Sequence, residues 1–155
     1  MRRIMEDVVL REEYPTPEEY QAVRQAVGWT LPESQAIADC LRRSSYCLCA
    51  RRNGELVGMA RIVGDGELVH YIQDVIVVPA CQGEGIGKRL MDRILEYVRR
   101  HAVRHTIVGL IAARGKEPFY ERYGFFARPN GTFGAGMTIF WDEDAAAAGT
   151  EKDTP

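Results

Sequence analysis

Long apolar runs are missing from this sequence of 155 residues. The most apolar stretches, residues 75–78 and 107–113, are far shorter than the roughly 20 residues that a membrane-spanning helix needs. Near the N-terminus, Glu6 and Asp7 precede any apolar segment of signal-peptide length. We therefore expect a cytoplasmic protein that is neither secreted nor inserted into a membrane.

Cysteine and histidine are also scarce, with four and three residues respectively. A chain of this length can bury a sizeable core without cross-links, so the cysteines are expected to be reduced thiols rather than a disulfide framework. Cys47 and Cys49 are separated by one residue, not by the two of a zinc knuckle, and the histidines follow no ligand pattern. We expect no metal site.

Neither sign of charge is in large excess, because 20 Lys and Arg face 22 Asp and Glu. The resulting net charge of −2 argues against nucleic-acid binding driven by phosphate neutralisation. Hydrophobic residues make up 46% and charged residues 27%, as in compact globular proteins. The length favours one domain, which we place at residues 1–141, followed by a disordered tail, rich in alanine and acidic residues, at 142–155.

Hydrophobic periodicity predicts an order of elements that mixes strands and helices. Helices are expected at residues 17–27, from 31 to about 42, from 87 to about 100 and at 118–123, and the Thr16-Pro17 pair marks the first start. Strands are expected at residues 8–13, 46–51, 56–63, 68–78, 106–113, 125–128 and 137–141. Asn53-Gly54 predicts a tight type I′ hairpin turn. The apolar strand at 106–113 suits a parallel pairing buried on both faces.

A glycine-rich segment, Gln82-Gly-Glu-Gly-Ile-Gly-Lys88, separates the long strand from the third helix. A dinucleotide fingerprint starting at Gly83 would need glycine where Lys88 stands, and a Walker loop would need glycine at Gln82 and Ser or Thr at Arg89. Neither fits. The remaining pattern is Gln-x-x-Gly-x-Gly at a helix N-terminus, where backbone amides and a partial positive charge can bind pyrophosphate. Lys88 and Arg89 add full positive charges. A plain strand-to-helix turn is the other interpretation.

At this point the sequence resembles the GNAT acetyltransferase superfamily. The resemblance rests on Asp74-Val-Ile-Val-Val-Pro79, the glycine segment, the apolar strand and Phe119-Tyr-Glu-Arg-Tyr-Gly-Phe125 in that order, and it covers about residues 53–126. It implies an α+β (α/β) fold with one mixed, mostly antiparallel sheet of about six to seven strands. The sheet would have a central parallel V-shaped splay and about four helices around it.

The resemblance also implies an acetyl-CoA site. The backbone at Gly83, Gly85, Gly87 and Lys88 would hold the pyrophosphate, and the pantetheine arm would lie along the strand that ends at Val78. An amide near Val77 would polarise the thioester carbonyl. The full set of expected cofactor-binding residues is Ile76, Val77, Val78, Gln82, Gly83, Glu84, Gly85, Ile86, Gly87, Lys88, Phe119 and Tyr120.

Acetylation of an amine needs a base for the ammonium proton and an acid for the departing thiolate. The resemblance assigns the acid to Tyr120, with simple packing as the alternative. The base stays open: Asp74 is the first candidate, or else a structural carboxylate, and His70 and Glu117 are the others considered. Strict alternation places Asp74 on the same face as His70 and opposite Tyr71, Gln73 and Val75.

The expected partner is a small-molecule amine, acetylated by direct attack in a ternary complex. Trp29, Tyr71, Gln73 and Phe133 are candidate acceptor-binding residues. A non-catalytic acyl-CoA-binding regulator and a protein N-acetyltransferase remain alternatives. The final strands, with Phe140 and Trp141, are candidates for a homodimer contact.

Overall fold

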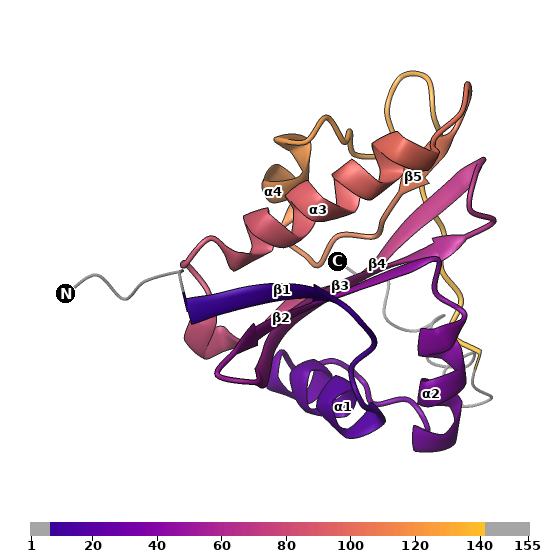
Figure 1. The fold of residues 1–155 in the computed structure, drawn as a ribbon. Helices are drawn as coiled ribbons and strands as arrows, with labels where there is room; N and C mark the ends of the chain where they lie inside the picture. The colour runs from indigo at the N-terminus through magenta and orange to yellow at the C-terminus, as the bar shows by residue number, and fades with distance from the viewer. Residues whose placement is uncertain (1–6, 142–155) are drawn as a thin grey trace. The chain divides into compact units, whose positions relative to one another are not determined.

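The computed structural model describes residues 7–141, so the expected tail at 142–155 lies outside the described part. The chain divides into two compact units, Met1–Leu110 and Ile111–Pro155. The first unit contains one sheet with the strand order β1-β2-β3-β4-β5 (Figure 1). The first four strands are antiparallel neighbours, and β5 is parallel to β4. The mixed, mostly antiparallel α+β architecture predicted from the sequence is therefore confirmed.

Four successive strands form the antiparallel part: β1 (Val8–Glu12), β2 (Tyr46–Arg52), β3 (Glu55–Gly64) and β4 (Val69–Val77). The β2–β3 connection is the predicted tight turn. Asn53 and Gly54 have φ values of 52° and 82°, and positive φ at both central positions is what a type I′ turn requires.

Helices α1 (Pro17–Ala26) and α2 (Ser34–Arg42) separate β1 from β2. The start of α1 is a capping box, in which the Thr16 hydroxyl accepts from the Glu19 amide and the Glu19 carboxylate accepts from the Thr16 amide. Pro17 occupies the first helical position, where its missing N–H costs nothing. The predicted helix start is confirmed to the residue.

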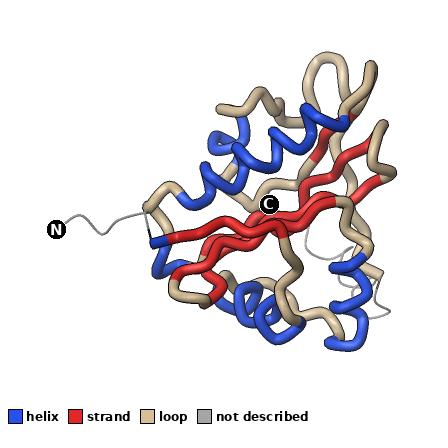
Figure 2. The backbone as a smooth tube through the Cα atoms, in the orientation of Figure 1, coloured by secondary structure: helices blue, strands red, loops and turns tan. Residues whose placement is uncertain are grey.

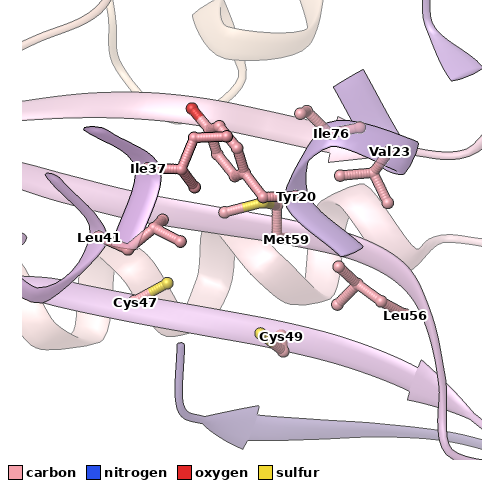
Figure 3. Packing of buried hydrophobic residues seen from close by; sticks show 9 residues of the cluster. All are labelled: Tyr20, Val23, Ile37, Leu41, Cys47, Cys49, Leu56, Met59 and Ile76. Atoms are coloured by element: carbon pink, nitrogen blue, oxygen red, sulfur yellow. The ribbon is translucent and has the colours of Figure 1, made fainter. Parts of the chain in front are cut away.

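The two helices cover one face of the sheet, and α3 (Ile86–His101) covers the other (Figures 1 and 2). Between α1, α2 and the strands lies a buried cluster formed by Tyr20, Val23, Ile37, Leu41, Cys47, Cys49, Leu56, Met59 and Ile76 (Figure 3). Cys47 and Cys49 are free thiols in this cluster. No described helix has the length and apolar character needed to cross a membrane.

A β-bulge interrupts β4 at Asp74. Between the pairs Arg61↔Gln73 and Met59↔Ile76, β4 has one residue more than β3, and Asp74 has a φ of 58°. His70 contacts Tyr97 of α3, whereas Asp74 contacts α1 on the opposite face. The expectation that His70 and Asp74 share a face, with Gln73 opposite Asp74, is therefore wrong. An extra residue shifts the period-2 alternation by one position.

The last strand of the sheet, β5 (Ile107–Gly109), is shorter than the predicted 106–113 and is not buried on both faces. Ile107 is 66% exposed. Parallel pairing runs only from Val69↔Ile107 to Tyr71↔Gly109, while β4 continues to Val77. Along the rest of β4, the edge away from β3 has no strand partner among residues 7–141. The parallel splay predicted next to β4 is therefore present.

In the second unit, α4 (Glu117–Glu121) confirms the short helix before Gly124. The strands predicted at 125–128 and 137–141 are wrong, since neither segment forms a ladder. Instead, the Asn130 side chain accepts from the amides of Thr132 and Phe133, and Arg128 donates to the Gly134 carbonyl. These bonds order the loop between the two segments and use no backbone group of either segment. The sheet consequently has five strands among the described residues, not six or seven.

Candidate functional site

The loop after β4 is built to bring backbone close to a ligand. Pro79–Cys81 form the short 3-10 helix η2, and Gln82 leads into Gly83, whose φ is 79°. Gly85, with a φ of 81°, is the N-cap of α3. Left-handed backbone at both positions favours glycine, and a Cβ at Gly83 would meet nothing within 4 Å. The glycine at 83 therefore serves conformation and open access rather than tight packing within the protein.

No side chain of the first turn of α3 or of its N-cap residue neutralises the partial positive charge at the N-terminus of this helix. Gly85 offers no side-chain cap, and the first turn contains no acidic residue. The opening amides of an α-helix lack intrahelical acceptors and carry a partial positive charge. With sixteen residues, α3 is long enough for this end to bind an anion such as a pyrophosphate.

The charged side chains around the loop are bonded to other groups of the same chain. The Glu84 carboxylate pairs with Arg52 of β2 at 2.5 Å. Lys88 pairs with Asp92 at 2.7 Å, and Arg89 donates to the Val8 carbonyl. The positive charges expected to sit over the anion are therefore engaged along the helix and at β1. The anion-binding capacity of this loop rests mainly on its backbone.

The end of β4 presents amides on alternating sides. The Val78 amide donates to the Val57 carbonyl of β3 at 2.9 Å. Because backbone N–H groups alternate along an antiparallel strand, the Val77 amide points to the opposite edge, where β4 has no strand partner among the described residues. At that edge the Gln82 side chain donates to the Val77 carbonyl at 2.9 Å. Of the two amides, Val77 is thus the one directed to the open edge.

Asp74 lies in a buried charge cluster on the α1 face. Its Oδ2 accepts from the Tyr20 hydroxyl at 2.6 Å and from Arg61 Nε at 2.7 Å. Its Oδ1 accepts from Arg24 Nη1 at 2.7 Å and from Gln73 Nε2 at 3.3 Å. The Asp74 side chain is fully buried. Each oxygen of this carboxylate already accepts two hydrogen bonds from the protein, so this environment suits a structural role.

The cluster also sets the protonation of its members. Burial, the Asp74 charge and the hydrogen bond to it raise the pKa of Tyr20 to about 12. Burial acts to lower the pKa of Arg61, but the hydrogen bond and charge of Asp74 outweigh it and raise that pKa above its usual value. Tyr20 therefore remains a neutral donor, and Arg61 remains a cation.

Two of the three predicted acceptor residues of the first unit, Trp29 and Gln73, contact this cluster. The Arg24 guanidinium lies over the Trp29 ring at 5.4 Å and bonds to Asp74, to which Gln73 also donates. Tyr71 lies two residues before Gln73, opposite Val63 of β3. Sequence reasoning missed Tyr20 and Arg61. The four-residue spacing of Tyr20 and Arg24 indicated a shared helix face, but nothing local indicated a partner 50 residues away.

The predicted residues of the second unit have their own surroundings. Tyr120 makes edge-to-face contacts with Phe119 and Phe125, with ring centroids 5.0 and 6.3 Å apart. Burial raises the pKa of the Tyr120 phenol. Phe133 stacks on Phe126 and lies under the Arg128 guanidinium.

Comparisons with known proteins agree with this arrangement. The family model described as acetyltransferase (GNAT) family matches residues 7–125. The N-acetyltransferase ycf52 of Pyropia yezoensis is 28% identical over 127 residues, which cover 79% of this chain and 70% of that protein.

Two solved structures extend the comparison. A probable acetyltransferase from meticillin-resistant Staphylococcus aureus has a TM-score of 0.80 and 29% identity, covering 86% of this chain and 99% of that one. A GNAT acetyltransferase from Brucella melitensis, solved with acetyl-CoA, shares the fold with a TM-score of 0.59 and 24% identity, covering 77% of this chain and 83% of that one. The family match spans most of the sequence and includes the glycine loop, the bulged strand and the motif around Tyr120, so this chain belongs to the GNAT family of N-acetyltransferases.

Proposed function

We propose that this protein transfers an acetyl group from acetyl-CoA to a primary amine of a small molecule, by direct attack in a ternary complex. The observation that carries the proposal is the glycine loop at the uncapped N-terminus of α3, next to the open edge of β4. Acetyl-CoA supplies an activated acyl group on a good leaving thiol. Its diphosphate fits the amides at Gly83 to Lys88.

The open edge of β4 supports the binding of an extended arm. An amide-containing chain can add to an unpaired strand edge as another strand would. The Val77 amide is directed to this edge, and we assign to it the hydrogen bond that stabilises the negative charge developing on the carbonyl oxygen. Val78 contributes no such donor, because its amide is bonded to Val57.

Protons must balance in the transfer. The ammonium first releases a proton to solvent; the amine nitrogen then forms its bond to the acetyl carbon while the carbon–sulfur bond breaks. The departing sulfur receives a proton from an acid of the protein, and the second proton lost by the nitrogen returns through solvent to that acid. We assign the role of this acid to Tyr120, whose raised pKa keeps the phenol protonated at neutral pH. We assign to Asp74 the role of the negative charge that holds Arg24 and Arg61, not that of the acceptor of the ammonium proton.

Thiol release from acetyl-CoA with a panel of amines tests the proposal. We expect turnover with at least one small amine, and Tyr120→Phe should lower kcat by about 100-fold or more with little change in the KM for acetyl-CoA. Tyr123→Phe, in the same segment, is the matched control and should retain activity. Tight acetyl-CoA binding with no turnover on any amine would instead indicate a regulator, and turnover only on peptides a protein acetyltransferase.

A further inference from the structure

A pocket lies on the α1/α2 face of the sheet, and none of its lining residues belongs to the glycine loop. It has a volume of about 510 Å³ and lies between the C-terminal half of α2 and β3. It is lined by Ala36, Asp39, Cys40, Arg43, Arg61 and Val63. This volume falls in the range of small-molecule sites and is too small for a folded partner.

Arg61 forms part of the wall of this pocket and is only partly used by the protein. Its Nε donates to Asp74 and its Nη1 donates to Ser44. Its Nη2 has no hydrogen-bond partner among residues 7–141. It is also absent from the side-chain nitrogen and oxygen atoms there that are fully buried without a partner, so this nitrogen is accessible. The Arg61 side chain is 11% exposed. A held guanidinium with one accessible nitrogen is a preorganised donor for an anionic oxygen.

The charges around the pocket do not cancel. In the buried cluster the single carboxylate of Asp74 faces two guanidinium groups, Arg24 and Arg61, which leaves one positive charge in excess. At the rim, Asp39 is paired with Arg42, while the exposed Arg43 forms no ion pair with the described residues. An uncompensated buried cation is costly unless an anion joins it. The pocket therefore attracts negative charge.

The position of the pocket relates it to the proposed reaction. Arg61 pairs with Gln73 of β4, and Val77, whose amide faces the open edge, lies four residues further along the same strand. The bulge at Asp74 shortens this stretch, because Val77 pairs with Gly58, three residues before Arg61 in β3, and three residues of strand span about 10 Å. A small molecule of several bonds can therefore have one end at Arg61 and its other end near Val77.

We infer that the acceptor amine carries an anionic oxygen group, a carboxylate or a phosphate, at the end opposite its amine, and that Arg43 and Arg61 bind that group. The apolar side chains of Ala36, Cys40 and Val63 accommodate the connecting carbon chain. Arg61 also holds Asp74, so the specificity of the pocket depends on a residue of the folding core, whereas Arg43 contributes to binding alone. The placement of the substrate's amine near Val77 rests on the proposed function, whereas the binding of its anionic group by Arg43 and Arg61 does not.

Equilibrium binding tests the anion end without depending on turnover. Titration of 4-aminobutanoate and 3-aminopropyl phosphate, with butylamine and propylamine as neutral-tail partners, is followed by calorimetry on the protein saturated with coenzyme A. We expect both anionic probes to bind, the amines without an anion to bind at least about tenfold more weakly, and Arg43→Ala to remove the preference. Arg43→Lys should retain part of it.

Arg42→Ala is the matched control, because Arg42 is the adjacent exposed arginine and pairs with Asp39 rather than lining the pocket. It should leave the preference intact. Equal binding of anionic and neutral-tail amines, no binding of either anionic probe, or equal loss in both arginine variants would overturn the inference. Preference for the phosphate over the carboxylate probe, or the reverse, identifies which anion the pocket takes.

The same variants in the thiol-release assay separate the two proposals. If anionic amines are acetylated with at least about tenfold higher kcat/KM than their neutral-tail partners, and Arg43→Ala removes the difference, both stand. If neutral-tail amines are acetylated equally well, the inference fails and the proposed function stands. If the anionic probes bind through Arg43 but acetyl-CoA neither binds nor turns over, the proposed function fails and the anion site stands.

Discussion

Arg52, the last residue of β2, forms an ion pair with Glu84 in the glycine loop, with 2.5 Å between Nη2 and Oε2. The Nη1 atom of the same guanidinium lies 3.4 Å from Cys81 Sγ in η2. The Arg52 and Glu84 side chains are each about three-quarters buried. One arginine thus tethers the loop to the sheet and neutralises the only acidic residue within Gln82–Lys88. Without it, the Glu84 carboxylate would stand as an unpaired negative charge beside the proposed diphosphate site.

Arg52→Ala should therefore raise the KM for acetyl-CoA by up to about fivefold with kcat unchanged, because a partly exposed ion pair is worth no more than about 1 kcal/mol. Steady-state kinetics at low and high salt measure the effect. Glu84→Gln alone should change little, and the Arg52→Ala/Glu84→Gln double variant should recover most of the affinity. Failure of the double variant to recover would mean that Arg52 acts only by tethering the loop.

Gly83→Ala should weaken coenzyme A binding and destabilise the protein by about 1 kcal/mol, since its φ of 79° is unfavourable for a residue with a Cβ. No neighbour lies close enough for a clash to add to this cost. Gly131→Ala is the control, because Gly131 has no Cβ neighbour and is not among the glycines of positive φ. Urea unfolding and calorimetry with coenzyme A measure both effects; equal results for the two variants would contradict the prediction.

Asp74→Asn should lower the free energy of unfolding by about 3 kcal/mol or more, because it leaves Arg24 and Arg61 buried without a counter-charge. Tyr20→Phe removes one hydrogen bond to the same carboxylate and should cost about 1 kcal/mol. Asp92→Asn, which breaks only the exposed pair with Lys88, should stay within about 0.5 kcal/mol. A small effect of Asp74→Asn on stability combined with a large loss of kcat would restore Asp74 as the base.

Acid should destabilise the protein through Glu19. The hydrogen bonds from Arg51 and from the Thr16 amide lower the pKa of Glu19 from 4.5 to about 2, although partial burial opposes them. A carboxylate whose pKa is depressed on folding contributes stability above pH 4.5 that is lost as the pH falls toward 2. The stability difference between the wild type and Glu19→Gln should therefore be largest above pH 5 and shrink by pH 3. Glu55→Gln, which removes an exposed carboxylate without a hydrogen bond among the described residues, is the control variant.

Local signals were enough for the start of the first helix and for the tight turn between β2 and β3. Thr16-Pro17 and Glu19 form a capping box, and Asn53-Gly54 adopts the left-handed conformations of a type I′ turn, because both effects depend on a few neighbouring residues. The spacing of glycines at 83, 85 and 87 likewise excluded two nucleotide motifs and left a backbone anion site at a helix N-terminus. Family membership follows from the same local motifs.

Contacts between distant residues could not be predicted in this way. The bulge at Asp74 reverses the face of every later residue of β4, and it depends on the fit of that strand to β3 rather than on its own composition. The apolar segment 106–113 reads as a buried strand, but only three of its residues find a partner. Arg61, Asp74 and Arg24 form one cluster only because α1 packs on that face of the sheet. Short-range patterns therefore specified the helices, the turns and the glycine loop. The charge in the proposed acceptor pocket arises from side chains that meet only when the sheet and its covering helices pack together.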